Sequence, residues 1–261
     1  MATGRFEETG FASQFFPAFN LSMIKRSYVV VLLLVSEVAF SQISDFGSWN
    51  VINTKLNFTE HWSVFNELQL RSQSFYSNFY YYEVKGGVAY AVNKNFTFLL
   101  GTGKYVTYSD PGDFTKPVAT NETRFWQQLI MNNFLERLKF EHRYRVEQRW
   151  FKDGRYRNRF RYRLNLAIPI NHNKIEPKTF YIAAFDEIFL TNKEPHFERN
   201  RLFAGAGYRA AKWVTIQPGY LYQYDYKPNN NSVGKHFFQL TIALEIDAHK
   251  DTKEKMPGAH D

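Results

Sequence analysis

Charged and apolar side chains alternate almost residue by residue from Leu138 to Ile168, and this stretch constrains the fold of the 261-residue chain more than any other. Asp153-Gly154, a hairpin turn signal, divides the stretch into two runs. A period of two over about a dozen residues on each side of a turn indicates two antiparallel β-strands. One face of this hairpin is charged: Lys139, Glu141, Arg143, Arg145, Glu147 and Arg149 before the turn, and Arg155, Arg157, Arg159, Arg161 and Arg163 after it.

The same period recurs along the chain in eleven strand-like runs. They span about 10 to 13 residues, near the length that crosses an outer membrane at a tilt, whereas soluble strands average about 5 to 6. Connections alternate between short turns and longer loops, as in membrane barrels. Aromatic residues at the run ends predict girdles at two membrane interfaces: Trp49, Trp62, Tyr90, Tyr108, Trp150, Tyr208, Trp213 and Tyr224.

These features predict an all-β fold, a closed antiparallel transmembrane β-barrel of about 10 to 12 strands with a polar, charged lumen. Closure follows because a bilayer offers no water to the open edge of a sheet. Bacterial single-chain barrels have an even number of strands. The count of eleven therefore implies that one run is misread or that a twelfth is missed.

The first 41 residues carry a different pattern. Lys25 and Arg26 precede an apolar segment at 28–35 and a small-x-small sequence at 39–41, which is typical of a secretory signal peptide. The apolar segment is too short to span a bilayer as a helix. We expect translation to start at Met23, cleavage before Gln42, a barrel over 42–247, and a polar tail over 248–261. An uncleaved N-terminal anchor is the alternative.

Composition excludes several classes of function. The net charge is +8, but Lys and Arg alternate with Glu on strands, so no nucleic-acid partner is predicted. The chain has no Cys, which removes disulfides and thiolate metal sites. Its seven His lack ligand spacing, and the loop residues His172 and His196 have no evident third ligand. No metal site and no cofactor is expected.

Several spaced motifs stand out along the chain: Arg124-Phe125-Trp126-Gln127-Gln128, the segment 142–149, Arg161-Tyr162-Arg163-Leu164, the segment 200–205 and the segment 219–223. The chain is similar to DUF2490, outer-membrane barrel proteins common in the Bacteroidetes, over roughly residues 42–247. The resemblance implies the barrel fold and the outer-membrane compartment, and it implies little about activity. One departure from many outer-membrane barrels is that the chain does not end on an aromatic residue.

The charged face would line the lumen, and its arginines need carboxylates or water around them. The sequence predicts a pore that favours small or acidic anions, because guanidinium groups match carboxylate and sulfate geometry. Two alternatives stay open: a salt-bridged plug without conductance, and a lipid-modifying enzyme that uses His142. We expect no catalytic residue, outer-membrane lipid and small anionic solutes as partners, and no particular oligomeric state. The candidate solute contacts are Arg143, Arg145, Arg149, Arg157, Arg159, Arg161, Arg163, Glu141, Glu147, Glu67, Arg71 and Arg201.

Overall fold

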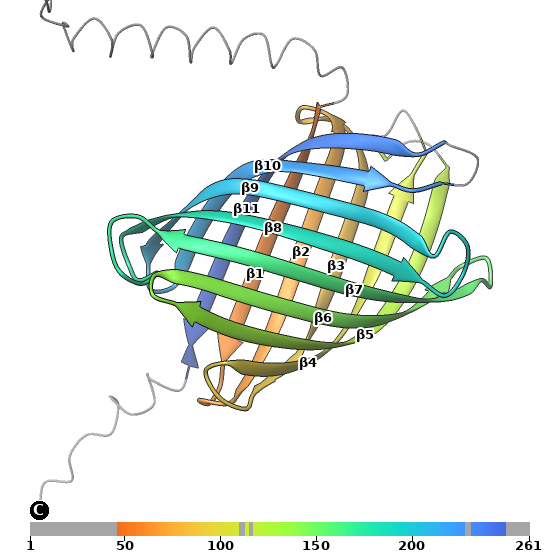
Figure 1. Cartoon of the computed structure of the whole chain (residues 1–261). Coiled ribbons are helices and arrows are strands. Elements are labelled where there is room, and N and C mark those ends of the chain that lie inside the picture. The colour runs from red at the N-terminus through yellow and green to blue at the C-terminus, as the bar shows by residue number, and fades with distance from the viewer. Residues whose placement is uncertain (1–45, 110–112, 115–116, 228–230, 249–261) are drawn as a thin grey trace, which may run out of the picture. The chain divides into compact units, whose positions relative to one another are not determined.

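A computed structural model describes residues 46–109, 113–114, 117–227 and 231–248, which form one closed barrel of eleven strands (Figure 1). The predicted signal peptide and nearly all of the polar tail lie outside these residues. Within them, no helix is long and apolar enough to cross a membrane. The strands are β1 (Phe46–Asn57), β2 (Trp62–Ser74), β3 (Ser77–Ala91), β4 (Phe96–Tyr108), β5 (Val118–Leu135), β6 (Leu138–Phe151), β7 (Tyr156–Pro169), β8 (Thr179–Thr191), β9 (Phe197–Ala211), β10 (Val214–Asp225) and β11 (Val233–Asp247).

The barrel closes through a parallel pair. Each strand is antiparallel to the next along the chain, and β1 pairs with β11 in parallel, from Phe46↔His236 to Asn57↔Asp247. The eleven predicted runs are thus confirmed in the described part of the chain, but the expected even count and the fully antiparallel sheet are wrong. Consecutive strands reverse direction, so an odd number brings the first and last strands to the same direction. Closure between them can only be parallel.

The two ends of the barrel are named here by the residues that reach them. The Phe46 end carries the connections 75–76, 109–117, 152–155, 192–196 and 226–232. The Asp247 end carries 58–61, 92–95, 136–137, 170–178 and 212–213. Four of these last five are short turns, as predicted. The nine-residue loop 170–178 breaks the predicted alternation of short and long connections.

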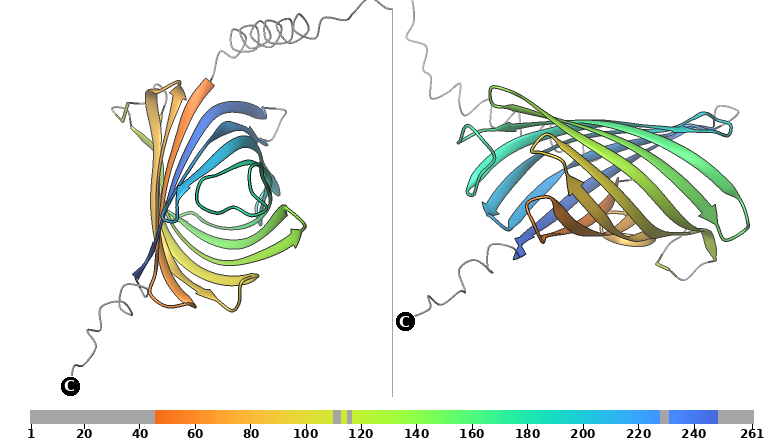
Figure 2. Two further views of the ribbon diagram at one scale, coloured as in Figure 1. Left: turned by 90° about the vertical axis from the view of Figure 1, so that its left-hand side faces the viewer. Right: turned by 90° about the horizontal axis from the view of Figure 1, so that it is seen from below.

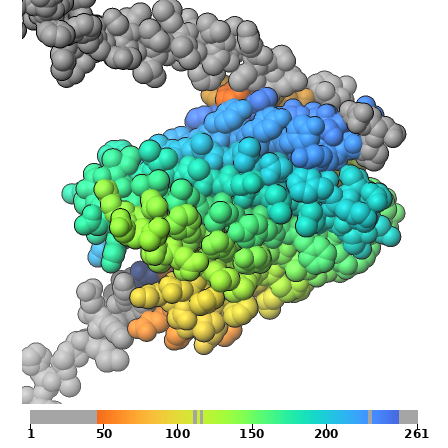
Figure 3. Space-filling model, viewed as in Figure 1, coloured from red at the N-terminus to blue at the C-terminus, as the bar shows by residue number. Residues whose placement is uncertain are grey.

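Figure 2 shows the strands of the barrel curving around a central opening. Apolar side chains cover most of the outer surface, and most of the charged side chains on the strands face the interior. Side chains such as Phe98, Ile182 and Leu202 are exposed outside, while Glu147 and Arg159 are buried inside. The face seen in Figure 3 is a continuous wall of packed side chains. Sequence alternation alone does not say which face is outside, and the closed barrel resolves this.

Exposed aromatic rings stand at both ends of the outer surface. Trp62 and Tyr90 lie 4.8 Å apart, centroid to centroid, at the Asp247 end, and Trp150 and Tyr156 lie 5.5 Å apart at the Phe46 end. The prediction that Trp49 belongs to such a girdle is wrong. Trp49 is one of the inward-facing residues of β1, and its side chain is 3% exposed inside the barrel.

The central hairpin forms as its alternation predicts. β6 and β7 pair from Lys139↔Ala167 to Trp150↔Tyr156, and Gly154 adopts the positive φ of 84° that the tight turn requires. One neighbouring boundary differs from the sequence reading. The sequence predicts a loop over 109–121 and a turn at 132–133, but β5 begins at Val118 and extends to Leu135. The loop before it therefore spans 109–117, and the turn after it falls at 136–137.

Candidate functional site

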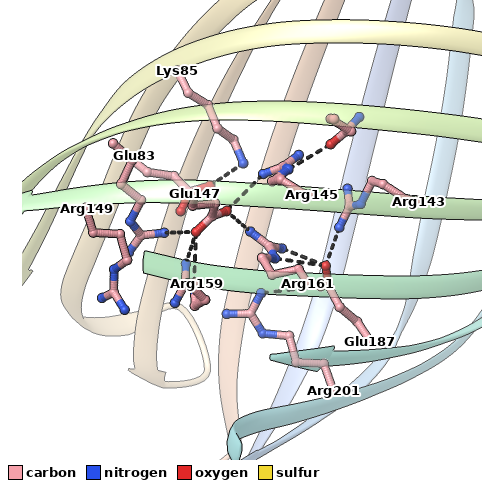
Figure 4. Close-up of polar contacts among 12 residues, drawn as sticks. Glu83, Lys85, Arg143, Arg145, Glu147, Arg149, Arg159, Arg161, Glu187 and Arg201 are labelled. Carbon is pink, nitrogen blue, oxygen red and sulfur yellow. Dashed lines mark hydrogen bonds and ion pairs between the residues drawn. The ribbon is translucent and has the colours of Figure 1, made fainter. Parts of the chain in front are cut away.

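A fully buried carboxylate organises the middle of the lumen (Figure 4). Glu147 on β6 accepts hydrogen bonds from Nε of Arg159 at 2.9 Å and from Nη1 of Arg161 at 2.7 Å. Arg159 lies directly opposite Glu147 in the β6–β7 register, and Arg161 is its diagonal neighbour. Arg145 and Arg124 approach the same carboxylate at 3.4 and 3.9 Å. Four guanidinium groups thus share one negative charge.

Glu187 on β8 forms a second centre on the Asp247 side of this layer. It accepts hydrogen bonds from Arg161 at 2.7 and 3.1 Å and from Arg143, and Arg201 lies 3.8 Å away. Arg161 therefore bridges Glu147 and Glu187 across the barrel interior (Figure 4). The side chain that links the two centres comes from β7, which contains four of the five alternating arginines that follow the turn in the sequence.

Further ion pairs extend the network toward the Phe46 end. Glu122 on β5 binds Arg149 at 2.7 Å and also pairs with Arg124. Glu198 on β9 lies between Arg149 at 3.2 Å and Arg159 at 3.3 Å. The sequence reading did not include Glu122 and Glu198 among the candidate residues.

The β2–β3 side of the lumen contributes its own cluster. Lys85 bridges Glu67 and Glu83, at 2.6 Å from the latter, and Arg71 lies 3.3 Å from Glu83. Tyr81 donates a hydrogen bond to the same Glu83 carboxylate. The register places Glu67 opposite Lys85, so this cluster also follows from strand pairing.

Aromatic rings inside the barrel complete the packing, and the sequence reading missed them. The Arg71 guanidinium lies between the rings of Trp49 and Tyr81, 3.4 and 3.9 Å from their centroids. Trp126 and Phe189 are fully buried. The alternation in the sequence could have identified them, because each ring is an even number of residues from inward-facing charged residues on its own strand and therefore points to the same face. Guanidinium groups stack favourably on such ring faces.

The packed layer divides the lumen into three cavities. A cavity of about 480 Å³ lies toward the Phe46 end, one of about 240 Å³ in the middle, and one of about 900 Å³ toward the Asp247 end. The first two share Gln69, Lys85, Arg161 and Arg201 in their walls. These shared side chains lie where an open channel would have to pass.

The loop 170–178 narrows the Asp247 end. Its Ile175 packs inward against the buried cluster that contains Tyr181 and Ala183, and Figure 2 shows the loop lying across the opening. Arg137 fixes the loop by donating hydrogen bonds to the carbonyls of Pro169 and Ile170 at 2.7 and 2.9 Å, and to that of residue 172 at 3.0 Å. The loop is therefore held in place at this end of the barrel.

All twelve candidate residues face the barrel interior, and the structure joins most of them in the network above. Arg163 pairs separately with Glu141 at 2.9 Å. Arg157 makes no ion pair with any residue that the structure describes. His142 lies on the outer surface, where its Nδ1 is 2.9 Å from the hydroxyl of Tyr162, and no described serine hydrogen-bonds to it. Among the described residues, no group of three or more His, Asp and Glu could hold a metal ion.

Comparison with protein families agrees with the sequence resemblance. Residues 46–234 match the model of a family described as "Protein of unknown function (DUF2490)". The chain belongs to DUF2490. The match begins at the first residue of β1 and reaches the start of β11, so DUF2490 and the barrel cover nearly the same residues. No curated protein and no solved structure matches this DUF2490 chain.

Proposed function

We propose that this protein is a bacterial outer-membrane barrel that does not conduct ions and that holds anionic solutes at one end of its lumen. The membrane location rests on an inverted distribution of side chains, with apolar residues outside and charged residues inside a closed sheet. Rings such as Trp62 and Trp150 at the two rims suit the two membrane interfaces. In water, this outer surface would be a very large exposed apolar patch.

The proposal that the lumen does not conduct is supported by one observation. Glu147 is completely buried among the arginines that pair with it. Arg159, Trp126 and Phe189 are 2%, 0% and 0% exposed beside it. Opening a water-filled path here would require these rings and ion pairs to separate. Breaking buried ion pairs of this kind typically costs several kcal/mol.

The solute-binding part of the proposal rests on the charge of the cavity at the Phe46 end. Ten cationic side chains and four carboxylates line it. A water-filled cavity with such an excess of one charge concentrates counter-ions. We further propose that the barrel is not an enzyme, since His142 lies on the opposite, outer face and its one side-chain hydrogen bond in the described structure is to Tyr162, not to a serine.

A selective pore is the second candidate, because the three cavities follow one another along the barrel. The middle cavity shares Glu141, Asn165 and Gln217 with the cavity at the Asp247 end, and it shares Arg161 and Arg201 with the one at the Phe46 end. A rearrangement of the shared side chains would connect them. Such a path would favour anions.

Single-channel recording from the refolded protein in a planar bilayer separates these two candidates. We expect no conductance from a wild-type barrel that migrates as a folded, heat-modifiable band on a gel. Reproducible conductance steps with anion selectivity under a salt gradient would instead establish the pore. A variant with Arg143, Arg145, Arg159 and Arg161 replaced by Gln would then lose that selectivity.

A further inference from the structure

The cavity at the Phe46 end, called here the vestibule, contains more positive charge than its carboxylates balance. Four carboxylates line the vestibule. Three more form ion pairs with its cations although they do not line it, namely Glu67, Glu147 and Glu187, so seven carboxylates compensate the positive charge. Ten cations still exceed these by three. The vestibule cations are Arg71, Lys85, Arg124, Arg149, Arg159, Arg161, Arg199, Arg201, Lys227 and Lys235.

Two of the least compensated cations lie on β9 and β11. Arg201 donates its Nε to the amide oxygen of Gln223 at 2.9 Å, and the carboxylate nearest to it, Glu187, is 3.8 Å away. Lys235 makes no ion pair with any described residue, and its Nζ lies 5.3 Å from the centroid of the Tyr80 ring. Both side chains therefore have donors left for a ligand.

Arg71 adds a rigid, buried donor to the same wall. Its guanidinium is held between two aromatic rings, and its buried Nε has no hydrogen-bond partner. Arg201 contacts one of those rings as well, at 4.7 Å from the centroid of Trp49. Two guanidinium groups on one indole repel each other, and an unsatisfied buried donor costs about 1–3 kcal/mol. An anion between such groups would offset both costs.

We infer that Arg71, Arg201 and Lys235 form a binding site for the oxyanion group of a small polar solute. Guanidinium forks bind phosphate, sulfate and carboxylate through paired hydrogen bonds. The vestibule volume of about 480 Å³ falls within the range of sites for small organic ligands, so a sugar phosphate or a similar acidic sugar fits the cavity better than a bare ion. This inference rests on the proposed function, because it names the class of anionic solute that the Phe46 end of the lumen would hold. It does not depend on whether the lumen conducts ions.

Isothermal titration of the refolded protein in detergent micelles tests the site directly. The ligands are glucose 6-phosphate, inorganic phosphate and glucose, at equal ionic strength. We expect glucose 6-phosphate to bind and glucose not to bind. Inorganic phosphate that binds as tightly as the sugar phosphate would identify a free oxyanion as the ligand, whereas weaker binding would show that the sugar contributes.

Two variants and a control locate the binding. Lys235→Gln and Arg201→Gln should each weaken glucose 6-phosphate binding at least tenfold, and Lys235→Gln removes no ion pair that supports the fold. Lys104→Gln is the control, because Lys104 is exposed on the outer surface of β4 at the same end. The site would be overturned if the folded wild type did not bind glucose 6-phosphate. It would also be overturned if Lys235→Gln bound glucose 6-phosphate with the same affinity as the wild type. Neither result depends on the conductance measurement, which tests the closed lumen separately.

Discussion

Gly101 on β4 lies directly under the indole of Trp126 on β5, and the two residues are register partners. A Cβ atom added to Gly101 would lie 2.4 Å from Cε2 and Cζ2 of the ring. No real Cβ contact is that short, so the ring occupies the volume that a side chain would otherwise fill. The glycine thus lets the largest buried ring of the lumen lie flat against the barrel wall.

Replacing Gly101 with Ala should therefore destabilise the barrel. Because Trp126 is fully buried and cannot swing away without displacing its neighbours, we expect a loss of about 1–3 kcal/mol in the free energy of unfolding. Urea unfolding of the protein in lipid vesicles, followed by tryptophan fluorescence, measures this loss. Gly86→Ala is the matched control on the adjacent strand, since its Cβ would meet only a backbone oxygen at 3.1 Å. Equal stability of the two variants would contradict the packing argument.

Removal of the central carboxylate should have a larger effect than removal of an exposed one. Glu147→Gln leaves Arg159 and Arg161 buried beside a neutral amide, so we expect a loss of about 3–5 kcal/mol in the free energy of unfolding. Asp153→Asn, in the turn between β6 and β7, breaks an exposed ion pair with Arg155 and should leave the unfolding curve unchanged. The same urea titration compares the two variants. A Glu147→Gln variant as stable as Asp153→Asn would show that the layer does not hold the lumen closed.

How much of this fold the sequence predicts depends on what its alternation encodes. The period of two on β6 and β7 predicts the strands, the turn at Gly154 and the separation of a charged face from an apolar one, because these are local properties. It does not predict the partners of Glu187, which lies on β8 and reaches Arg143 across β7. Trp49 was misplaced for a related reason: a ring at a strand end looks the same in sequence whether it faces lipid or a guanidinium group.

The parallel closure between β1 and β11 places Phe46 and Asp247 at opposite ends of the barrel. In an outer membrane, the two ends face opposite sides, and three of the five connections at the Phe46 end are five residues or longer. Longer loops usually face outward. We therefore expect the turn containing Asp153 to face the cell exterior and the turn containing Glu60 to face the periplasm.

Single-cysteine labelling tests this orientation cleanly, because the chain contains no Cys. A membrane-impermeant maleimide should label Asp153→Cys in intact cells. Glu60→Cys should react only after the outer membrane is permeabilised, and both variants should react fully once the protein is solubilised. Labelling of Glu60→Cys alone in intact cells would reverse the orientation. Labelling of both in intact cells would contradict a spanning barrel.

Arg137 ties the loop 170–178 to the turn between β5 and β6, because it donates hydrogen bonds to the carbonyls of Ile170 and His172 and to that of Pro169 at the end of β7. Arg137→Ala should release the loop, since each hydrogen bond from a charged donor contributes about 1.5–3 kcal/mol. Trypsin should then cleave after Lys174 at least tenfold faster than in the wild type, while the strands stay folded and the heat-modifiable gel band persists.

Arg155→Ala, which removes an arginine from the turn at the opposite end, should leave the rate of cleavage at Lys174 unchanged. If Arg137→Ala is cleaved at the wild-type rate, then Ile175 packing and the hydrogen bonds of the loop to Thr179 and Phe180 hold the loop without Arg137.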